Sequence, residues 1–265
     1  MKRGACFRAC LVAATALLAP HFAWAQLQPH RAEYTLRLGT AANAPRVGTA
    51  VQDITRDCAG WHIRRELSAE IPLTASWKVT LASRLTGEEE RDGNRLRYRL
   101  VLVPNGAERE TQGAVERADG ETRGEIMTPD ERQQVVLPPG TLMPVAAVSH
   151  LVDRLLAGVA TFPVLLFAPE GTEAFQLDVK ELEPNGLQAP PPTLKPVPVP
   201  AARSWAVLAT VKRPGRQDQK PLASARARIF NSGVIDRLTV DAGIVTVTAD
   251  LRALEMHEPP VCPGR

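Results

Sequence analysis

The feature that most constrains the fold is an alternation of apolar and polar side chains with a period of two residues. It covers positions 61–71, where Trp61 and Ile63 alternate with His62 and Arg64, and it recurs over 31–38, 77–86 and 95–102. Successive side chains of a strand point to opposite faces, so each segment predicts a strand with one buried and one hydrated face. This pattern is typical of antiparallel sheets, because the strands of a parallel sheet are apolar on both faces.

Short turn signals separate these alternating segments. Asp92-Gly93-Asn94, Asp119-Gly120 and Asp241-Ala242-Gly243 each lie between two candidate strands. Asp, Asn and Gly tolerate the positive φ of tight hairpin turns, so each signal predicts a hairpin. Further strands are expected at 175–182, 204–212 and 223–230. The sequence therefore predicts a mainly β protein with roughly twelve to fourteen antiparallel strands.

One helix interrupts the predicted strands, at about 144–157. Pro144 suits the first turn of a helix, where its missing N–H is not needed. Val145, Val148, Val152 and Leu155 then recur at helical spacing, and Gly158 is well placed to end the helix. We expect a single amphipathic helix whose apolar stripe packs against the sheet.

A Pro-rich stretch at 189–200 holds six prolines in twelve residues. Proline cannot donate to a strand ladder, so this stretch predicts an extended loop or linker. As a linker it would divide the chain into two domains. We favour a loop within one domain spanning 26–265, because a cysteine pair discussed below lies on both sides of it.

The first 25 residues are typical of a secretory signal peptide. They contain a basic start, an apolar run at 11–19 and the cleavage motif Ala23-Trp24-Ala25. The apolar run is about half the length needed to span a bilayer, so we expect a cleaved signal, a protein exported across an inner membrane and no membrane-spanning segment. The segment carries three of the 32 basic residues and none of the 29 acidic ones. The mature chain would therefore be close to neutral, which disfavours nucleic-acid binding.

Two cysteines, Cys58 and Cys262, remain after removal of the signal. An even pair in an oxidising compartment predicts a disulfide, which would tie an early strand to the C-terminal end. Two unpaired thiols are the alternative.

No motif points to a metal site, a cofactor or a catalytic centre. The four histidines of the mature chain lie apart, without the spacing of zinc ligands. Ser149-His150 with Asp153 resembles part of a hydrolytic triad, but an adjacent Ser-His pair on a helix points in divergent directions, and a G-x-S-x-G elbow is absent. We therefore predict no catalytic residues.

Two charged segments predict hydrated surface. Glu88-Glu89-Glu90 is interpreted as a solvated charged turn, with a cation site as the alternative. Arg95, Arg97 and Arg99 form a basic stripe on one face of a strand, which would face solvent or meet an acidic partner or lipid headgroups.

Four aromatic residues fall on the apolar phase of their strands: Tyr34, Trp61, Trp77 and Tyr98. In a closed barrel they would line a ligand cavity, and in a sandwich they would form the core. They are our candidate cavity-lining residues.

Several segments in order resemble the EipB family of cell-envelope integrity proteins. They are Pro-His-Arg-Ala-Glu-Tyr at 29–34, Asp-Cys-Ala-Gly-Trp at 57–61, Leu-Met-Pro at 142–144, Leu-Ala-Gly at 156–158, and Cys262. The resemblance implies a periplasmic protein of Gram-negative bacteria that folds as a broken, many-stranded β-spiral around a helix, similar in shape to the Lol lipoprotein carriers. It also implies a disulfide between Cys58 and Cys262, a role in tolerance of envelope stress, and a functional link to a periplasmic tetratricopeptide-repeat protein.

These observations lead to three hypotheses about function. The first is a non-enzymatic periplasmic protein that supports envelope integrity by binding a protein or lipid-like partner. The second is a carrier of an acyl chain or a lipoprotein, with Trp61, Trp77 and Tyr98 lining its cavity. The third, which we expect to fail, is a hydrolase built around His150.

Overall fold

The computed structural model describes residues 27–74, 76–187, 190–192, 194–201, 203–215 and 220–263. These residues form one antiparallel sheet of 14 strands and one helix. In chain order the elements are β1 (His30–Leu38), β2 (Arg46–Arg56), β3 (Gly60–Pro72), β4 (Lys78–Glu90), β5 (Arg95–Pro104), β6 (Arg109–Ala118), β7 (Glu121–Met127), β8 (Arg132–Leu137), α1 (Pro144–Leu156), β9 (Thr161–Ala168), β10 (Glu173–Leu182), β11 (Ser204–Lys212), β12 (Ala223–Phe230), β13 (Ile235–Asp241) and β14 (Thr246–Met256).

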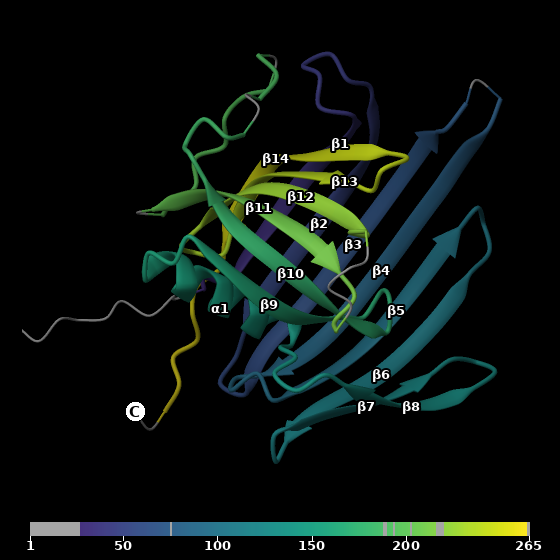
Figure 1. Cartoon of the computed structure of the whole chain (residues 1–265), viewed down its shortest axis with the longest axis vertical. Helices are drawn as coiled ribbons and strands as arrows, with labels where there is room; N and C mark the ends of the chain where they lie inside the picture. The colour runs from purple at the N-terminus through teal and green to yellow at the C-terminus, as the bar shows by residue number, and fades with distance from the viewer. Residues whose placement is uncertain are drawn as a thin grey trace, which may run out of the picture.

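The sheet consists of two antiparallel meanders, β1–β8 and β9–β14, which are joined by the pairing of β1 with β14. Its order runs from β8 back to β1, then crosses to β14 and continues down to β9 (Figure 1). His30 of β1 lies opposite Met256 of β14, so the first and last strands pair along their length. The two edges, β8 and β9, do not pair with each other. The molecule is therefore an open, broken barrel rather than a closed one.

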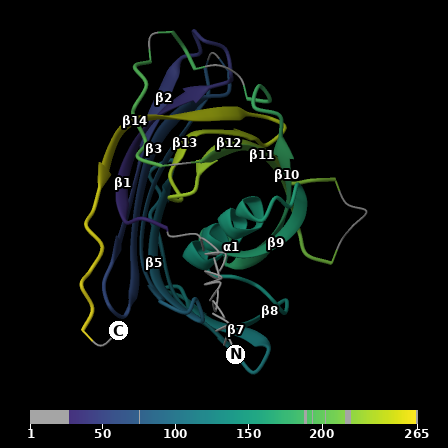
Figure 2. The ribbon, with the colours of Figure 1, turned by 90° about the vertical axis from the view of Figure 1, so that its left-hand side faces the viewer.

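The sheet curls around α1, which lies between the wall formed by β1–β5 and the wall formed by β9–β11 (Figure 2). Val152 and Leu155 of the helix belong to one core cluster with Val179 of β10 and Trp205 of β11. The start of the helix joins a second cluster that includes Trp61 of β3 and other residues of the first meander. The single helix therefore fills the space that the curled sheet encloses.

Local sequence signals account for most of the element boundaries. Asp119 and Gly120 both have positive φ, 53° and 80°, in the β6–β7 turn, and Gly93 and Gly243 have positive φ in two further predicted turns. The helix ends one residue before the predicted limit, at Leu156, and the N–H of Gly158 donates to the carbonyl oxygen of Leu155. The predicted strands at 204–212 and 223–230 coincide with β11 and β12.

Trp77 differs from our expectation. It precedes β4, which begins at Lys78, and 59% of it is exposed. The alternation extends through this residue in the sequence, but the β3–β4 turn has begun there, so the side chain is not held against the concave face.

The predicted signal peptide, 1–25, lies outside the described residues. Within the described part of the chain, no helix is both long and apolar enough to cross a membrane. The strands on the two sides of the Pro-rich stretch, β10 and β11, are paired neighbours in the one sheet.

Candidate functional site

A disulfide joins the turn between β2 and β3 to the chain that follows β14. The sulfur atoms of Cys58 and Cys262 are at bonding distance, 2.17 Å, and the residues are 204 positions apart. This is the pair that the cysteine count and the family resemblance predict. The bridge fixes the C-terminal segment beside the early strands, next to the junction of β1 and β14.

Three of the four candidate cavity-lining aromatics are buried. Trp61 and Tyr98 belong to the core cluster that meets the start of α1, and Tyr34 lies in a cluster with Leu251. The hydroxyl of Tyr34 donates to the carbonyl oxygen of Ile235 at 2.8 Å, and burial raises the pKa of this phenol. These side chains pack against protein atoms of the concave face, so they serve as core in this structure; their lining of a ligand cavity stays a prediction.

Tyr98 also connects the two meanders across the interior. Its ring lies 5.8 Å from the ring of Phe167 of β9, measured between centroids. On the neighbouring strand it covers Gly113, where an added Cβ would come within 2.4 Å of the ring. Burial raises the pKa of Tyr98 to about 12, with a smaller contribution from the charge of Glu170. A glycine at position 113 is therefore required for this ring to pack.

Glu89 is buried at the start of α1, contrary to the prediction of a solvated turn. Its two carboxylate oxygens accept the backbone N–H groups of Val145 and Ala146, both at 2.7 Å. The helix has no side-chain cap at Met143, so this distant carboxylate supplies the missing acceptor. Burial raises the pKa of Glu89 to about 7, although the two N–H donors act in the opposite direction. Glu89 lies in phase with Leu81 and Leu85 of the same strand, and that phase is the sequence signal for its inward direction.

The residues weighed for hydrolysis lie on the helix surface. His150 is exposed, and its neighbour Ser149 is half-buried. Among the residues that the structure describes, no group of three or more His, Cys, Asp or Glu side chains is placed to hold a metal ion. His62 and His257 instead pair with single carboxylates, those of Asp57 and Asp53.

The basic stripe on β5 lies on the exposed face of the sheet. Arg99 forms a two-pronged ion pair with Glu110, with distances of 2.9 and 2.7 Å, and Arg95 pairs with Glu116 at 2.7 Å. These pairs are exposed, so they contribute little to stability.

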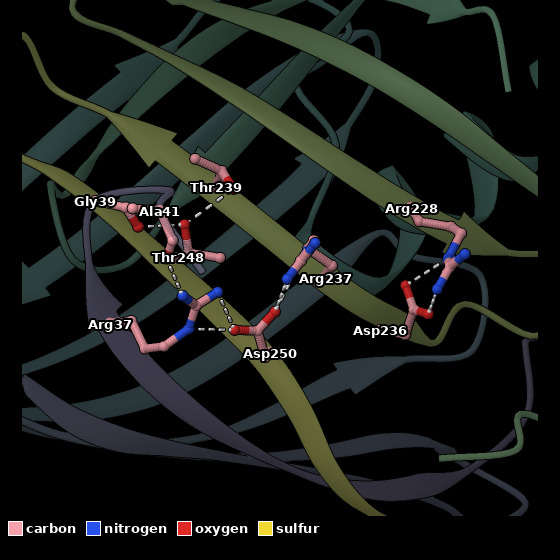
Figure 3. A network of polar contacts seen from close by, with 9 residues as sticks. All are labelled: Arg37, Gly39, Ala41, Arg228, Asp236, Arg237, Thr239, Thr248 and Asp250. Atoms are coloured by element: carbon pink, nitrogen blue, oxygen red, sulfur yellow. Dashed lines mark hydrogen bonds and ion pairs between the residues drawn. The ribbon is translucent and has the colours of Figure 1, made fainter. Parts of the chain in front are cut away.

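A second buried charged group, missed in the sequence, lies on the outer face of β1, β13 and β14 (Figure 3). Asp250 accepts from Arg37 through one carboxylate oxygen and from Arg237 through the other, each at 2.7 Å. The Asp250 side chain is 2% exposed, and each guanidinium-bearing side chain is 9% exposed. We call these three residues the Arg-Asp-Arg cluster.

The outer position of this cluster follows from the strand alternation. Leu238 packs into the core beside α1, and Leu251 is also buried in a core cluster. Their neighbours Arg237 and Asp250 therefore point to the opposite face. Arg37 and Asp250 are 213 positions apart, so only the register of β1 against β14 brings them together.

Comparisons with known proteins agree with the fold and with the resemblance seen in the sequence. The sequence model of the EipB-like family matches residues 22–258. The crystal structure of a β-barrel-like protein of a domain of unknown function from Brucella abortus superposes with a TM-score of 0.72 and 19% identity, covering 88% of this chain and 99% of that chain. None of the curated proteins matches. With a family match over most of its length, the chain belongs to the EipB-like family.

Proposed function

We propose that this chain is a periplasmic protein that supports the integrity of the cell envelope under stress by binding a protein or lipid-like partner, without catalysis. Membership of the EipB-like family supports this role. The disulfide between Cys58 and Cys262 supports the compartment, because such bonds persist in oxidising environments and are rare in the cytosol.

The observation that carries the proposal is the structural use of the buried titratable groups. Perturbed groups that gather in a cleft are a mark of active sites. Here the carboxylate of Glu89 is engaged by the start of α1, and the phenols of Tyr34 and Tyr98 lie in the core. Such an arrangement favours a stable binding scaffold over a reacting centre.

A deletion strain tests the role directly. We expect loss of the gene to reduce survival in detergent, and the full chain to restore it. Residues 26–265 without the signal should not restore survival, because the protein would stay in the cytosol. Normal survival of the deletion strain, or full rescue by the signal-less chain, would refute the proposal.

The family resemblance suggests a tetratricopeptide-repeat protein as the partner. Crosslinking in living cells, followed by mass spectrometry, should join this chain to a periplasmic protein of that class. The same crosslinks should disappear when the signal is removed. If only unrelated abundant proteins are crosslinked, this partner is wrong.

A carrier of an acyl chain or a lipoprotein is the second candidate. It is favoured by a set of half-buried aliphatic side chains on the concave face, Leu38, Leu67 and Ile71, which pack around Leu36 and Ala69. Displacement of a fluorescent fatty acid would measure such binding. The exchange Ile71→Ser should weaken it, and equal binding by Ile71→Ser would exclude this surface.

A further inference from the structure

The two edges of the sheet differ in how their backbone groups are satisfied. At the β9 edge, the N–H of Leu142 donates to the carbonyl oxygen of Leu165 at 2.8 Å, and the N–H of Phe167 donates to the carbonyl oxygen of Leu142 at 2.9 Å. Outward-pointing residues alternate along a strand, so Pro163 belongs to the same outward set, and proline has no N–H. The β9 edge is therefore capped against the addition of a further strand.

The β8 edge, at the lower border of the sheet in Figure 1, has no such cap within the described residues. Across the β7–β8 turn, the N–H of Thr128 donates to the carbonyl oxygen of Glu131, and the pairing of the two strands continues from there without a shift. Hydrogen-bonded pairs alternate with non-hydrogen-bonded pairs, so the backbone groups of Arg132, Gln134 and Val136 point away from β7. No described residue is hydrogen-bonded to these outward groups.

The side chains of β8 also leave its edge accessible. Gln133 and Gln134 are exposed, and Val136 is 76% exposed. The strand contains neither Pro nor Lys, the residues that commonly prevent pairing at an edge, and its one charged side chain, Arg132, forms an ion pair with Glu125 of β7. An accessible row of unpaired N–H and C=O groups is a template for another strand.

A second copy of β8 fits this edge in one antiparallel register. Two-fold pairing centred on Gln134 places this residue opposite itself and Arg132 opposite Val136, so all three outward residues form hydrogen-bonded pairs. Gln133 then lies opposite Val135, and no two like charges oppose each other. Centring the pairing on Arg132 would instead set two guanidinium groups against each other.

We propose that this protein forms a two-fold dimer in which β8 of one copy pairs with β8 of a second copy. Because the β9 edge is capped, each copy offers one edge, and the assembly closes at two copies instead of extending into a fibre. The proposal goes beyond the envelope role and does not depend on it. A contact through one strand of six residues belongs to the small, weak class of interfaces, so we expect a dissociation constant on the order of 10–100 µM.

Sedimentation velocity of the oxidised mature protein tests the proposal, at concentrations from tenfold below to tenfold above that value. We expect a reversible shift from monomer to dimer, with no larger species. A monomer at every concentration would overturn the proposal, because a second copy would then not be the occupant of this edge.

Exchanges at Val136 test the register. Val136→Lys places a positive charge opposite Arg132 of the second copy and should weaken dimerisation by about fivefold or more, because the like-charged pair occurs twice across the two-fold axis. Val136→Glu places the opposite charge there and should strengthen dimerisation. The matched control is Ile244→Lys, at a position that is 89% exposed in the β13–β14 turn, and it should dimerise as the wild type does. Equal dimerisation by Val136→Lys and Val136→Glu would overturn the register.

Gln134→Pro tests the backbone pairing itself. It removes an outward N–H and no hydrogen bond within the sheet, so the dimer should be lost while the fold is kept. Far-UV circular dichroism of this variant separates lost pairing from lost folding, and the Val136 exchanges do not depend on it. A folded Gln134→Pro variant that still dimerises would contradict the proposal.

Crosslinking through single cysteines locates the two-fold axis. Two copies of Gln134→Cys should be joined by a short bis-maleimide, because the Cα atoms of a hydrogen-bonded pair lie about 5.5 Å apart. The native cysteines are joined to each other and do not react. Asp130→Cys, exposed in the β7–β8 turn, is the control and should stay uncrosslinked, since its two copies would lie at opposite ends of the paired strands. Crosslinking of Asp130→Cys without Gln134→Cys would place the contact elsewhere and refute the proposal.

Discussion

The concave and outer faces of this sheet both bury charge, but in different ways. On the concave face, the carboxylate of Glu89 accepts hydrogen bonds from two backbone N–H groups at the start of α1, beside a core cluster. On the outer face, two guanidiniums share Asp250. The first arrangement completes a helix terminus. The second forms only when β1, β13 and β14 pair in register, so we expect one buried charge to depend on a helix terminus and the other on long-range strand pairing.

The largest effect is expected for Asp250→Asn. This exchange removes the charge that two buried guanidiniums share, so the free energy of unfolding should fall by about 3–5 kcal/mol. Urea denaturation measures the change. Asp130→Asn, the same exchange at an exposed loop position, should have little effect. Equal losses of stability in both variants would show that Asp250 stabilises the fold no more than an exposed carboxylate does.

Trp61 and Trp77 provide a matched pair of substitutions, one buried and one exposed. Trp61→Ala should cost about 3–5 kcal/mol, because it opens a cavity in the core that meets α1. Trp77→Ala should change stability by less than about 0.5 kcal/mol, since its side chain is largely exposed. Thermal melting of the two variants compares them. Similar destabilisation by both would mean that Trp77 packs against the concave face after all.

The disulfide is expected to contribute as much to stability as the side chain of Trp61, or somewhat less. Cys58→Ser should lower stability by about 2–5 kcal/mol, because it releases a link between residues 204 positions apart. A reductant should lower the melting temperature of the wild type and leave that of Cys58→Ser unchanged. A wild type indifferent to reductant would exclude a structural role for the bridge.

The smallest effect is a pH dependence from Glu89. The folded carboxyl has a pKa of about 7, against an ordinary value of 4.5. Between these values the folded state holds a proton that the unfolded state lacks, so the contribution of Glu89 to stability is greatest below pH 4.5 and falls as pH rises towards 7. The slope contributed by this group is at most about 1.4 kcal/mol per pH unit.

Urea denaturation across this pH range, compared between the wild type and Glu89→Gln, isolates the contribution of Glu89. In Glu89→Gln, the free energy of unfolding should no longer show the fall between pH 4.5 and pH 7 that Glu89 contributes. Other groups, including His30, whose pKa is lowered by burial, contribute equally to both proteins. Parallel profiles would contradict the raised pKa of Glu89.

The sequence predicts local structure well where one rule acts alone. Alternation places β11 and β12, and Pro144 with Gly158 brackets the helix. Alternation does not show where a strand begins, which is why Trp77 was assigned to the wrong environment. The charge of Glu89 suggested solvent, although its phase within β4 pointed to the core.

The buried charges on the outer face could not be predicted from the sequence. The Arg-Asp-Arg cluster depends on the register of β1 against β14, and a shift of one residue would move Asp250 to the other face. The Pro-rich stretch indicated only a loop, because nothing local specifies which face of the sheet it covers. The Arg-Asp-Arg cluster therefore depends on long-range strand pairing, whereas the individual strands follow from local patterning of the sequence.

Urea denaturation of Asp250→Asn and Glu89→Gln, followed from pH 4.5 to pH 7, tests the contrast between the two faces most directly. The account predicts a large loss of stability in Asp250→Asn, and the loss of the downward pH component only in Glu89→Gln. Wild-type stability of Asp250→Asn, or an unchanged pH profile of Glu89→Gln, would contradict it.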